Sequence, residues 1–185
     1  MPGQQLIRLS TEAMNHQLES VLRYLDEHGL KLVTAESCTA GLTASTLAEM
    51  PGCGSTLECA FVTYSASAKT GILDVKPETI EHFNLTSEEV AREMAEGALR
   101  VSRANVALAD TGLAGPSSGD SEIPVGTVCF AWAFQRGDEV KTFSETRKFN
   151  GDRNEVRQAS ADYMISRIWH YHNEVLKENA CNNAD

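Results

Sequence analysis

Apolar residues recur along this chain with two periods, one typical of amphipathic helices and one of buried strands. Between residues 18 and 25 they fall on one face of a helix, which Gly29 would end. Short and mostly apolar runs then predict three buried strands, at residues 32–35, 59–63 and 106–109.

Helical segments separate these strands. A helix is expected at residues 39–50, where Pro51 and Gly52 would end it, and a shorter helix at residues 67–73. Residues 86–89 (Thr-Ser-Glu-Glu) have the pattern of a capping box. The helix that this box begins would turn four apolar residues inward: Val90, Met94, Ala98 and Val101.

The last third of the chain predicts a hairpin followed by a helix. Strands at residues 125–134 and 140–149 would be joined by a turn at 136–138, and the more polar second strand is expected at a sheet edge. Asp152 can cap the final helix, with Glu155 in its third position. The apolar stripe of that helix consists of Met164, Ile168, Tyr171 and Val175. Residues 178–185 are polar and predict a frayed tail.

Alternation of helices with buried strands indicates a layered α/β fold, and the hairpin should make its sheet mixed. The chain has 185 residues, of which 42% are hydrophobic and 23% charged, so we expect one globular domain over residues 1–185. The 16 basic and 26 acidic residues give a net charge of -10. That charge argues against nucleic-acid and anionic-membrane partners, because both require a basic face.

Five cysteines without a CxxC pair suit neither a disulfide framework nor a zinc site. The first residues lack the pattern of a signal peptide, and the longest apolar run is too short to span a bilayer. We therefore expect a reduced, cytoplasmic protein without a membrane partner.

Three of the predicted strands end in residues that carry chemistry or expose backbone. The first is followed by residues 36–39 (Glu-Ser-Cys-Thr), the second by Tyr64 and the third by a glycine-containing turn that begins at Thr111. Parallel strands present their carboxyl ends at one edge of a sheet, where α/β folds bind ligands. We expect the three segments to meet at that edge.

Ser37 lies between a predicted strand and a helix of small residues. Its hydroxyl could act as a nucleophile, with the N–H groups of Cys38 and Thr39 holding a tetrahedral oxyanion. Helix capping is the commoner role of a serine at such a position. The five histidines lie in or beside predicted helices, away from the strand ends, so a Ser-His-Asp triad has little support.

Lys69 is the better candidate for the base. Its sequence neighbours are small and uncharged, so in a cleft its ammonium would lose solvation and its pKa would fall. Tyr64 would then relay or orient the proton between Lys69 and Ser37. A lysine near a helix start is more often a solvated surface residue, so this assignment depends on the shared sheet edge.

The turn from Thr111 to Gly115 matches neither a P-loop nor a dinucleotide fingerprint. Its two glycines would allow backbone to approach a ligand closely, although an ordinary loop explains them equally well. Arg153 lies in the first turn of the last predicted helix, where it could hold a phosphate together with the helix N–H groups. A surface arginine is the other interpretation.

Five segments keep a common order and spacing over nearly the whole chain: residues 34–41, 61–65 with Lys69, 111–116, 124–128 and 151–153. Together they resemble the CinA C-terminal domain family, whose characterised members are nicotinamide-nucleotide amidases. Two positions depart from the family pattern. Ala40 stands where many relatives have glycine, and Ala66 where asparagine is common.

The resemblance implies a three-layer α/β/α sandwich with a mixed, mainly parallel sheet and a C-terminal helix. It implies hydrolysis of the carboxamide of nicotinamide mononucleotide (NMN) to nicotinate mononucleotide and ammonia, in pyridine-nucleotide salvage, with no metal and no cofactor. Family roles carry over to Ser37 as the nucleophile, assisted by Lys69 and Tyr64. The residues expected to contact the substrate are Cys38, Thr39, Thr111, Gly112, Ala114, Gly115 and Arg153.

Two other hypotheses stay open. A catalytically inactive protein of the same fold would bind a nucleotide or serve in an interaction linked to competence or DNA damage. Alternatively Cys38 is the nucleophile, because a thiol at a helix start can have a lowered pKa. We also expect the chain to form a homo-oligomer.

Overall fold

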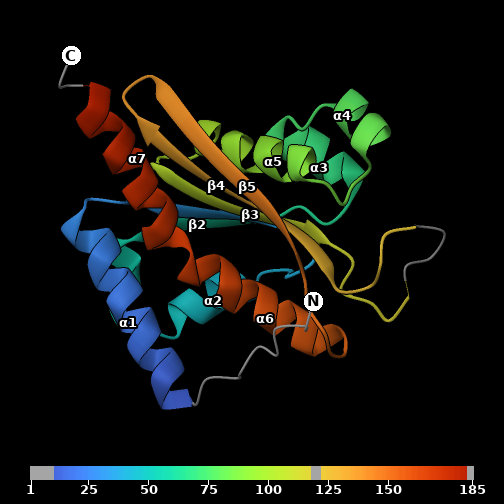
Figure 1. Ribbon diagram of the computed structural model, residues 1–185, viewed down its shortest axis with the longest axis horizontal. Coiled ribbons are helices and arrows are strands. Elements are labelled where there is room, and N and C mark those ends of the chain that lie inside the picture. Colours follow the sequence, from blue (N-terminus) through green and yellow to red (C-terminus); the bar gives the residue numbers. More distant parts are fainter. Residues whose placement is uncertain (1–10, 118–121, 183–185) are drawn as a thin grey trace.

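The computed structural model describes residues 11–117 and 122–182, which fold as a sheet covered by helices (Figure 1). Its strands lie in the order β2-β1-β3-β4-β5. Their bounds are β1 Leu32–Glu36, β2 Leu57–Val62, β3 Val106–Gly112, β4 Thr127–Arg136 and β5 Glu139–Lys148. β1 is parallel to β2 and β3, and β4 is antiparallel to β3 and β5. Four strands therefore run in one direction, and the predicted mixed, mainly parallel sheet is confirmed.

The burial of each strand follows its place in the sheet. Every residue of β1 is buried, as are the first six residues of β3, so the two central parallel strands are covered on both faces. β5 has no buried residue and lies at the edge, as its polar sequence predicts. The predicted hairpin between β4 and β5 is confirmed, with Arg136 paired to Glu139 across the turn.

Helices cover both faces of the sheet (Figure 1). On one face lie α3 Ala66–Leu73, α4 Pro77–Phe83 and α5 Glu88–Arg100. On the other lie α1 Thr11–Glu27, α2 Leu42–Ala48, α6 Arg153–Ser166 and α7 Ile168–Asn182. This arrangement is the expected three-layer α/β/α sandwich.

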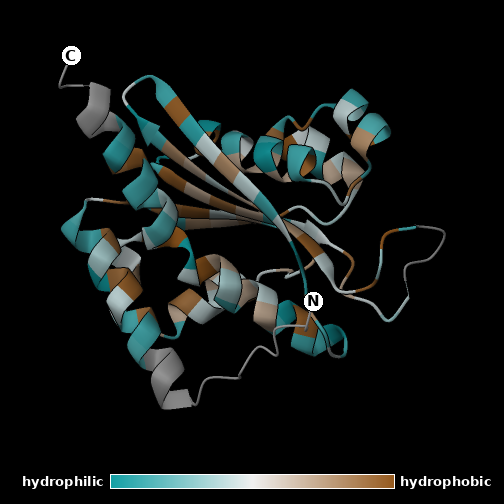
Figure 2. Ribbon diagram, in the orientation of Figure 1, coloured by the Kyte–Doolittle hydropathy of each residue, from teal (hydrophilic) through white to brown (hydrophobic). Residues whose placement is uncertain are grey.

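The two spaces between the layers hold different kinds of side chain. Alternation along β4 turns Phe130 and Trp132 toward α6 and α7, and turns Ala131 toward α5. The small residues on the α5 side leave room for Met94 of that helix. Figure 2 shows the resulting hydrophobic strands between helices that are hydrophilic on their outer sides.

The helix predicted at residues 39–50 is shorter than expected, because α2 begins only at Leu42. Ala40 and Gly41 have φ angles of 53° and 89°, in the left-handed region that a right-handed helix does not use. The predicted helix at residues 67–73 is confirmed as α3, which Ser65 caps by accepting a hydrogen bond from the amide of Ala68.

Two further details of the helix prediction were wrong or incomplete. Helix α4, which Pro77 begins, was not predicted. The residue that caps α5 is Ser87, whose hydroxyl accepts from the amide of Val90; this shifts the start by one residue from a capping box led by Thr86. The capping box of Asp152 and Glu155 at α6 is confirmed.

The last predicted helix is divided in two at Arg167, between α6 and α7. Its predicted stripe still packs inward: Met164, Ile168 and Tyr171 are buried, and Val175 lies against the same core. Helix α7 continues to Asn182, so most of the tail that we expected to be frayed is helical. Residues 183–185 of that tail lie outside the described residues.

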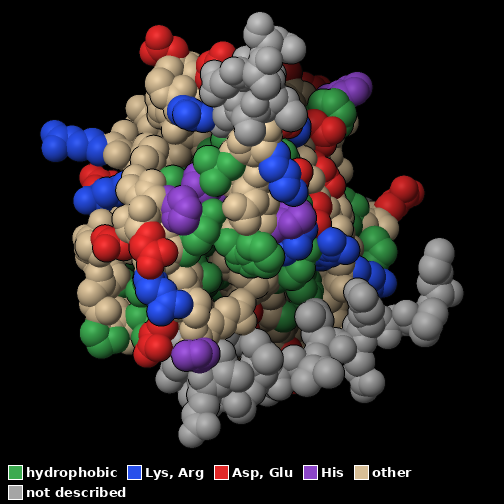
Figure 3. All heavy atoms as spheres, turned by 60° about the vertical axis from the view of Figure 1, so that its left-hand side comes forward, with side chains coloured by type: hydrophobic (Ala, Val, Ile, Leu, Met, Phe, Trp, Pro, Cys, Tyr) green, Lys and Arg blue, Asp and Glu red, His purple; other side chains and the backbone are tan. Residues whose placement is uncertain are grey.

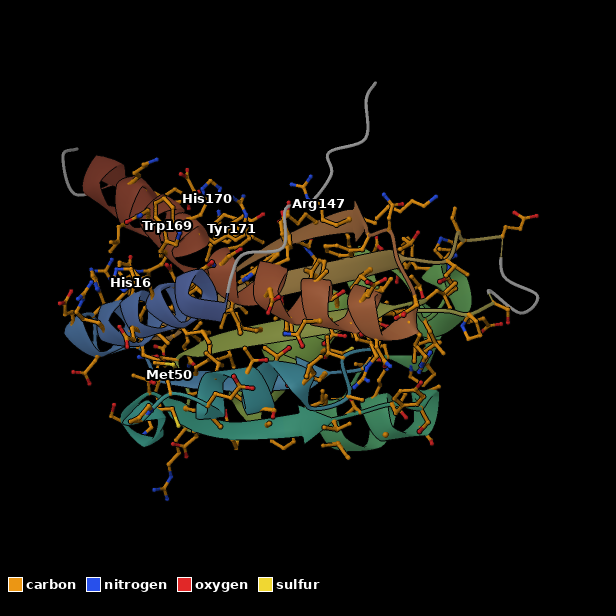
Figure 4. The ribbon with its side chains drawn as sticks, turned by 90° about the horizontal axis from the view of Figure 1, so that it is seen from below. His16, Met50, Arg147, Trp169, His170 and Tyr171 are labelled. Atoms are coloured by element: carbon orange, nitrogen blue, oxygen red, sulfur yellow. The ribbon has the colours of Figure 1, made fainter. Side chains whose placement is uncertain are left out.

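The surface formed by α1 and α7 mixes acidic and basic side chains (Figure 3). A hollow of about 370 Å³ on α7 is lined by Trp169, His170, Asn173, Glu174, Leu176 and Lys177. Figure 4 shows Trp169 and His170 on this helix, away from the strand ends that carry the predicted chemistry. Among the helices described here, none is long and apolar enough to cross a membrane.

Replacing Ala40 by glycine is expected to stabilise the fold. A left-handed conformation costs a non-glycine residue roughly 1–2 kcal/mol, whereas glycine loses about 0.5–1 kcal/mol through its greater freedom in the unfolded chain. The free energy of unfolding of Ala40→Gly, measured by urea denaturation, should therefore rise by about 0.5–1 kcal/mol. The control Ala48→Gly, at an exposed helical position, should lower it by up to about 1 kcal/mol. A loss of stability in Ala40→Gly would show that the turn is not strained.

Candidate active site

The three chemistry-bearing segments meet at the carboxyl edge of the parallel strands, as the sequence predicts. β2 and β3 flank β1 and run parallel to it, so Ser37, Thr63 and Thr111 follow or end neighbouring strands on the same side. The first turn of α6 reaches this edge, because Arg153 donates a hydrogen bond to the carbonyl of Gly115. Residues from four separate parts of the chain therefore form one cluster.

Ser37 and Lys69 are in direct contact at the centre of this cluster. The Lys69 Nζ lies 2.8 Å from the Ser37 Oγ and donates a second hydrogen bond, of 2.7 Å, to the carbonyl of Thr63. The Lys69 side chain is 1% exposed, so it is not the solvated surface lysine that its position alone would suggest. No carboxylate forms an ion pair with it within the described part of the chain.

The surroundings of Lys69 make its amine easier to deprotonate. Burial lowers the pKa of its ammonium to about 8, although the negative charges of Asp110 and Cys38, when ionised, oppose that shift. An uncharged amine is therefore available near neutral pH, with its nitrogen already within hydrogen-bond distance of the serine hydroxyl.

Helix capping does not explain Ser37. Helix α2 starts five residues later, and the residue at its N-cap is Gly41. The Glu36 carboxylate takes over the capping role, because it accepts hydrogen bonds from the amides of Thr43 (3.1 Å) and Ala44 (2.9 Å). The serine hydroxyl is thereby left to face Lys69.

Two buried carboxylates, Glu36 and Asp110, lie beneath the turn that carries Ser37 and were not predicted. Both are 0% exposed. Asp110 accepts hydrogen bonds from the thiol of Cys38 (3.0 Å) and the amide of Thr39 (3.1 Å). A signal was present in the sequence, since each acid directly follows an apolar strand run, where burial is expected.

The Cys38 thiol is a donor to Asp110 and is buried, so it is not the nucleophile. Burial, the nearby Asp110 charge and the hydrogen bond to that carboxylate raise the pKa of Cys38 well above its usual value. The expected lowering at a helix start fails because α2 does not begin at this residue.

The interpretation of Thr39 also changes. Its amide donates to Asp110, and its hydroxyl lies within hydrogen-bond distance of both Asp110 and Glu36. The side chain is 0% exposed and is therefore not placed to touch substrate. Of the two expected oxyanion donors, only the Cys38 amide has no hydrogen bond to another of the described residues.

Tyr64 and Arg153 form a second, more exposed part of the site. Tyr64 is 57% exposed, and its hydroxyl accepts a 2.9 Å hydrogen bond from the Arg153 guanidinium. In the described structure Tyr64 bonds neither Ser37 nor Lys69. Because Ser37 and Lys69 are in direct contact, a proton can pass between them without the expected relay through Tyr64.

The free N–H groups expected at the start of α6 are not available for a phosphate. The carboxylate of Asp152 accepts from the amides of Asn154 and Glu155 and brings a negative charge of its own. Arg153 is therefore the group of this helix start that remains suited to an anion.

Three residues expected to contact substrate face the interior instead. The Thr111 hydroxyl donates to the carbonyl of Leu85 (2.6 Å), and Ala114 is buried in the core. Gly112 is a packing residue, because a Cβ there would lie 2.7 Å from the carbonyl oxygen of Thr127 on β4. Only Gly115, through its carbonyl, is joined to Arg153.

Arg157 was missed and joins α6 to the serine turn. Its guanidinium donates to the carbonyls of Cys38 (3.2 Å) and Thr39 (2.7 Å). Its spacing of four residues from Arg153 places both arginines on one face of the helix, which is the signal that the sequence offered.

The described residues contain no group of three or more His, Cys, Asp or Glu placed to hold a metal ion. His28 and His172 contact Tyr24 at the junction of α1 and α7, and His16 and His170 lie on those two helices (Figure 4). The cluster around Ser37 thus consists of a serine, a lysine, two arginines, a tyrosine and two buried acids.

Comparison with known proteins identifies the family of this chain. A sequence model of the CinA C-terminal domain matches residues 14–171. A Shigella flexneri protein is 41% identical over 151 residues, and an Escherichia coli K12 protein is 40% identical over 153 residues. Both are named nicotinamide-nucleotide amidohydrolase PncC, and each match covers 82% of this chain and 90% of the relative.

The chain also matches part of a longer protein. It is 43% identical over 159 residues to a Symbiobacterium thermophilum protein named as competence-damage inducible. That match covers 83% of this chain but only 37% of the longer protein.

Solved structures give the same result. The crystal structure of the competence damage-inducible protein A from Klebsiella pneumoniae has a TM-score of 0.78 and 35% identity, covering 83% of this chain and 92% of that chain. A CinA superfamily protein from Escherichia coli has a TM-score of 0.79 and 32% identity. That match covers 88% of this chain and 93% of the Escherichia coli chain. By sequence and by fold, this chain belongs to the CinA C-terminal domain family.

Proposed function

We propose that this protein is an amidase that hydrolyses the carboxamide of NMN to nicotinate mononucleotide and ammonia, with Ser37 as nucleophile and Lys69 as base. The observation that carries the proposal is the 2.8 Å contact between the Ser37 Oγ and the buried Lys69 Nζ. The names of the Shigella and Escherichia relatives support the choice of substrate.

In the first step, uncharged Lys69 accepts the proton of the Ser37 hydroxyl while the Oγ attacks the carboxamide carbon. The hydrogen bond to the Thr63 carbonyl fixes the Lys69 nitrogen during this transfer. The Cys38 amide is the available donor for the developing oxyanion. Lys69 then passes its proton to the leaving nitrogen, which departs as ammonia and leaves an acyl-serine ester.

In the second step, a water molecule hydrolyses the ester. Lys69 accepts a proton from the water and returns one to the Ser37 Oγ, which restores the free enzyme and releases the carboxylate product. No step requires a group beyond those in the cluster.

Arg153 is suited to bind the phosphate of the nucleotide. A guanidinium has five N–H donors, and its two known bonds, to Tyr64 and Gly115, leave others for phosphate oxygens. Tyr64 would then orient the arginine and cover the substrate at the exposed side of the site. This gives the tyrosine a binding role in place of the proton relay.

Removing either member of the dyad should abolish turnover. Ser37→Ala lacks the attacking oxygen and Lys69→Met lacks the base, so ammonia release from NMN should fall by roughly 10³-fold or more in each. Ser45→Ala and Lys177→Ala, both exposed, are matched controls that should keep normal rates. A folded Ser37→Ala that still turned over would exclude the mechanism. Wild-type protein that binds NMN without releasing ammonia would favour the inactive binding protein.

The rate should depend on pH through Lys69. Because burial lowers the pKa of its ammonium to about 8 even when Asp110 is ionised, activity should rise with pH to a plateau, with a midpoint at or below that value. The measurement is kcat/KM for NMN across the pH range. A profile that is flat between neutral pH and pH 9 would contradict a lysine base.

Arg153→Ala should weaken binding of NMN more than binding of a substrate without phosphate. The loss of charge-assisted hydrogen bonds should raise KM for NMN by roughly 10- to 100-fold. Nicotinamide riboside, which lacks the phosphate, is the matched comparison, and its KM should change little. Equal losses for both substrates would show that Arg153 does not bind the phosphate.

A further inference from the structure

The hydroxyl of Thr39 lies between two buried carboxyl groups. Its Oγ1 is 2.6 Å from the Asp110 Oδ2 and 2.7 Å from the Glu36 Oε2, both within the range of hydrogen bonds between oxygens. All three residues are 0% exposed, so water does not supply further partners from outside. The hydrogens in the two contacts of the Thr39 hydroxyl must therefore come from these three side chains.

A hydroxyl has one hydrogen and can donate it to only one of the two carboxyl groups. If both carboxyls were ionised, the second contact would place an oxygen lone pair against a carboxylate oxygen, without a hydrogen between them. We propose that Glu36, Thr39 and Asp110 form a chain that holds one shared proton, carried by Asp110, so that Asp110 donates to Thr39 and Thr39 donates to Glu36.

The remaining contacts decide which acid carries the proton. Glu36 already accepts from three other donors: the amides of Thr43 and Ala44 and the hydroxyl of Thr34. Those two amides are free N–H groups of the first turn of α2, which favours a negative charge on Glu36. The Asp110 Oδ2, by contrast, has the Thr39 hydroxyl as its only recorded partner among the described residues.

The charges around Asp110 agree with this assignment. Burial raises the pKa of the Asp110 carboxyl; hydrogen bonds from Cys38 and Thr39 lower it, and the Glu36 charge raises it. The cations that face this group are Lys69 on α3 and Arg157 on α6, which donates to the carbonyls of Cys38 and Thr39. Asp110 accepts hydrogen bonds from neither.

A protonated Asp110 helps the base of the proposed reaction, and this step rests on the proposed function. An ionised Asp110 would raise the pKa of Lys69 by attracting its ammonium form. With the proton on Asp110 that attraction is absent, and Lys69 loses its proton more readily. Asp110 and Thr39 thus act as positioning residues, because they set the state of Lys69 and the shape of the serine turn without touching substrate.

The state of the acids can be tested without any substitution. Infrared spectra of the wild-type protein at pH 7 should show the carbonyl band of a protonated carboxylic acid. Exposed carboxyls give no such band at this pH, because pH 7 is well above their ordinary pKa range. The band should shift when aspartate is labelled with ¹³C and stay in place when glutamate is labelled. No acid band at pH 7, or a band that moves with labelled glutamate, would overturn the proposal.

Variants separate this proposal from the proposed function. Ser37→Ala should keep the infrared band even though it cannot react, so loss of activity does not affect the test. Asp110→Asn should remove the band and keep thermal stability near that of wild type, because an amide can donate to Thr39 as the protonated acid does. Glu36→Gln should unfold at a lower temperature. The NH₂ group of glutamine is a donor and cannot accept hydrogen bonds from the backbone amides of α2, as a carboxylate oxygen does.

The pH profile distinguishes a neutral Asp110 from an ionised one, because only an ionised Asp110 would raise the pKa of Lys69. Asp110→Asn replaces a neutral acid by a neutral amide, so the midpoint of the alkaline limb should stay where it is in wild type. If Asp110 were ionised in wild type, the substitution would remove a negative charge near Lys69 and move the midpoint to lower pH. That shift would overturn the assignment, and the exposed control Asp74→Asn should produce none.

Discussion

The turn after β1 depends on the Glu36 carboxylate, which is buried and yet bonded on both oxygens. It accepts the first amides of α2, so the helix can begin after a left-handed pair of residues that carries no capping side chain of its own. Ser37, directly after this acid, is thereby freed from capping and turned to the Lys69 amine. A buried charge that would otherwise be costly is stabilised by the same contacts that leave the Ser37 hydroxyl free to meet Lys69.

The site has a buried part and a solvent-exposed part, which differ in their chemistry. Ser37 and Lys69 lie at the buried end, where loss of solvation lowers the pKa of the Lys69 ammonium. Tyr64 and Arg153 lie at the exposed end, where an arginine keeps its charge and can meet an anion. A nucleotide amide has the same polarity, with an uncharged carboxamide at one end and a phosphate at the other.

Much of the fold was predictable because helix and strand periods are local properties of the sequence. The five strands, the edge position of β5 and the capping box at Asp152 were all correct. The convergence of Ser37 and Lys69 was predictable from the parallel strand ends. The interior positions of Thr111 and Ala114 were not, because which way a loop side chain turns depends on distant partners such as the Leu85 carbonyl. The roles of Asp110 and Arg157 likewise depend on partners far away in the chain, which no local pattern encodes.

The two hydrogen bonds from Arg157 to the serine turn have a consequence for folding during synthesis. Arg157 lies 118 residues beyond Thr39 in the chain, yet it holds the carbonyls on either side of the bond between Cys38 and Thr39. On the ribosome, the β1 segment emerges long before α6, and domains generally fold as units during synthesis. The serine turn therefore receives this support only after α6 has been synthesised, so a nascent chain that stops short of α6 lacks the two hydrogen bonds from Arg157.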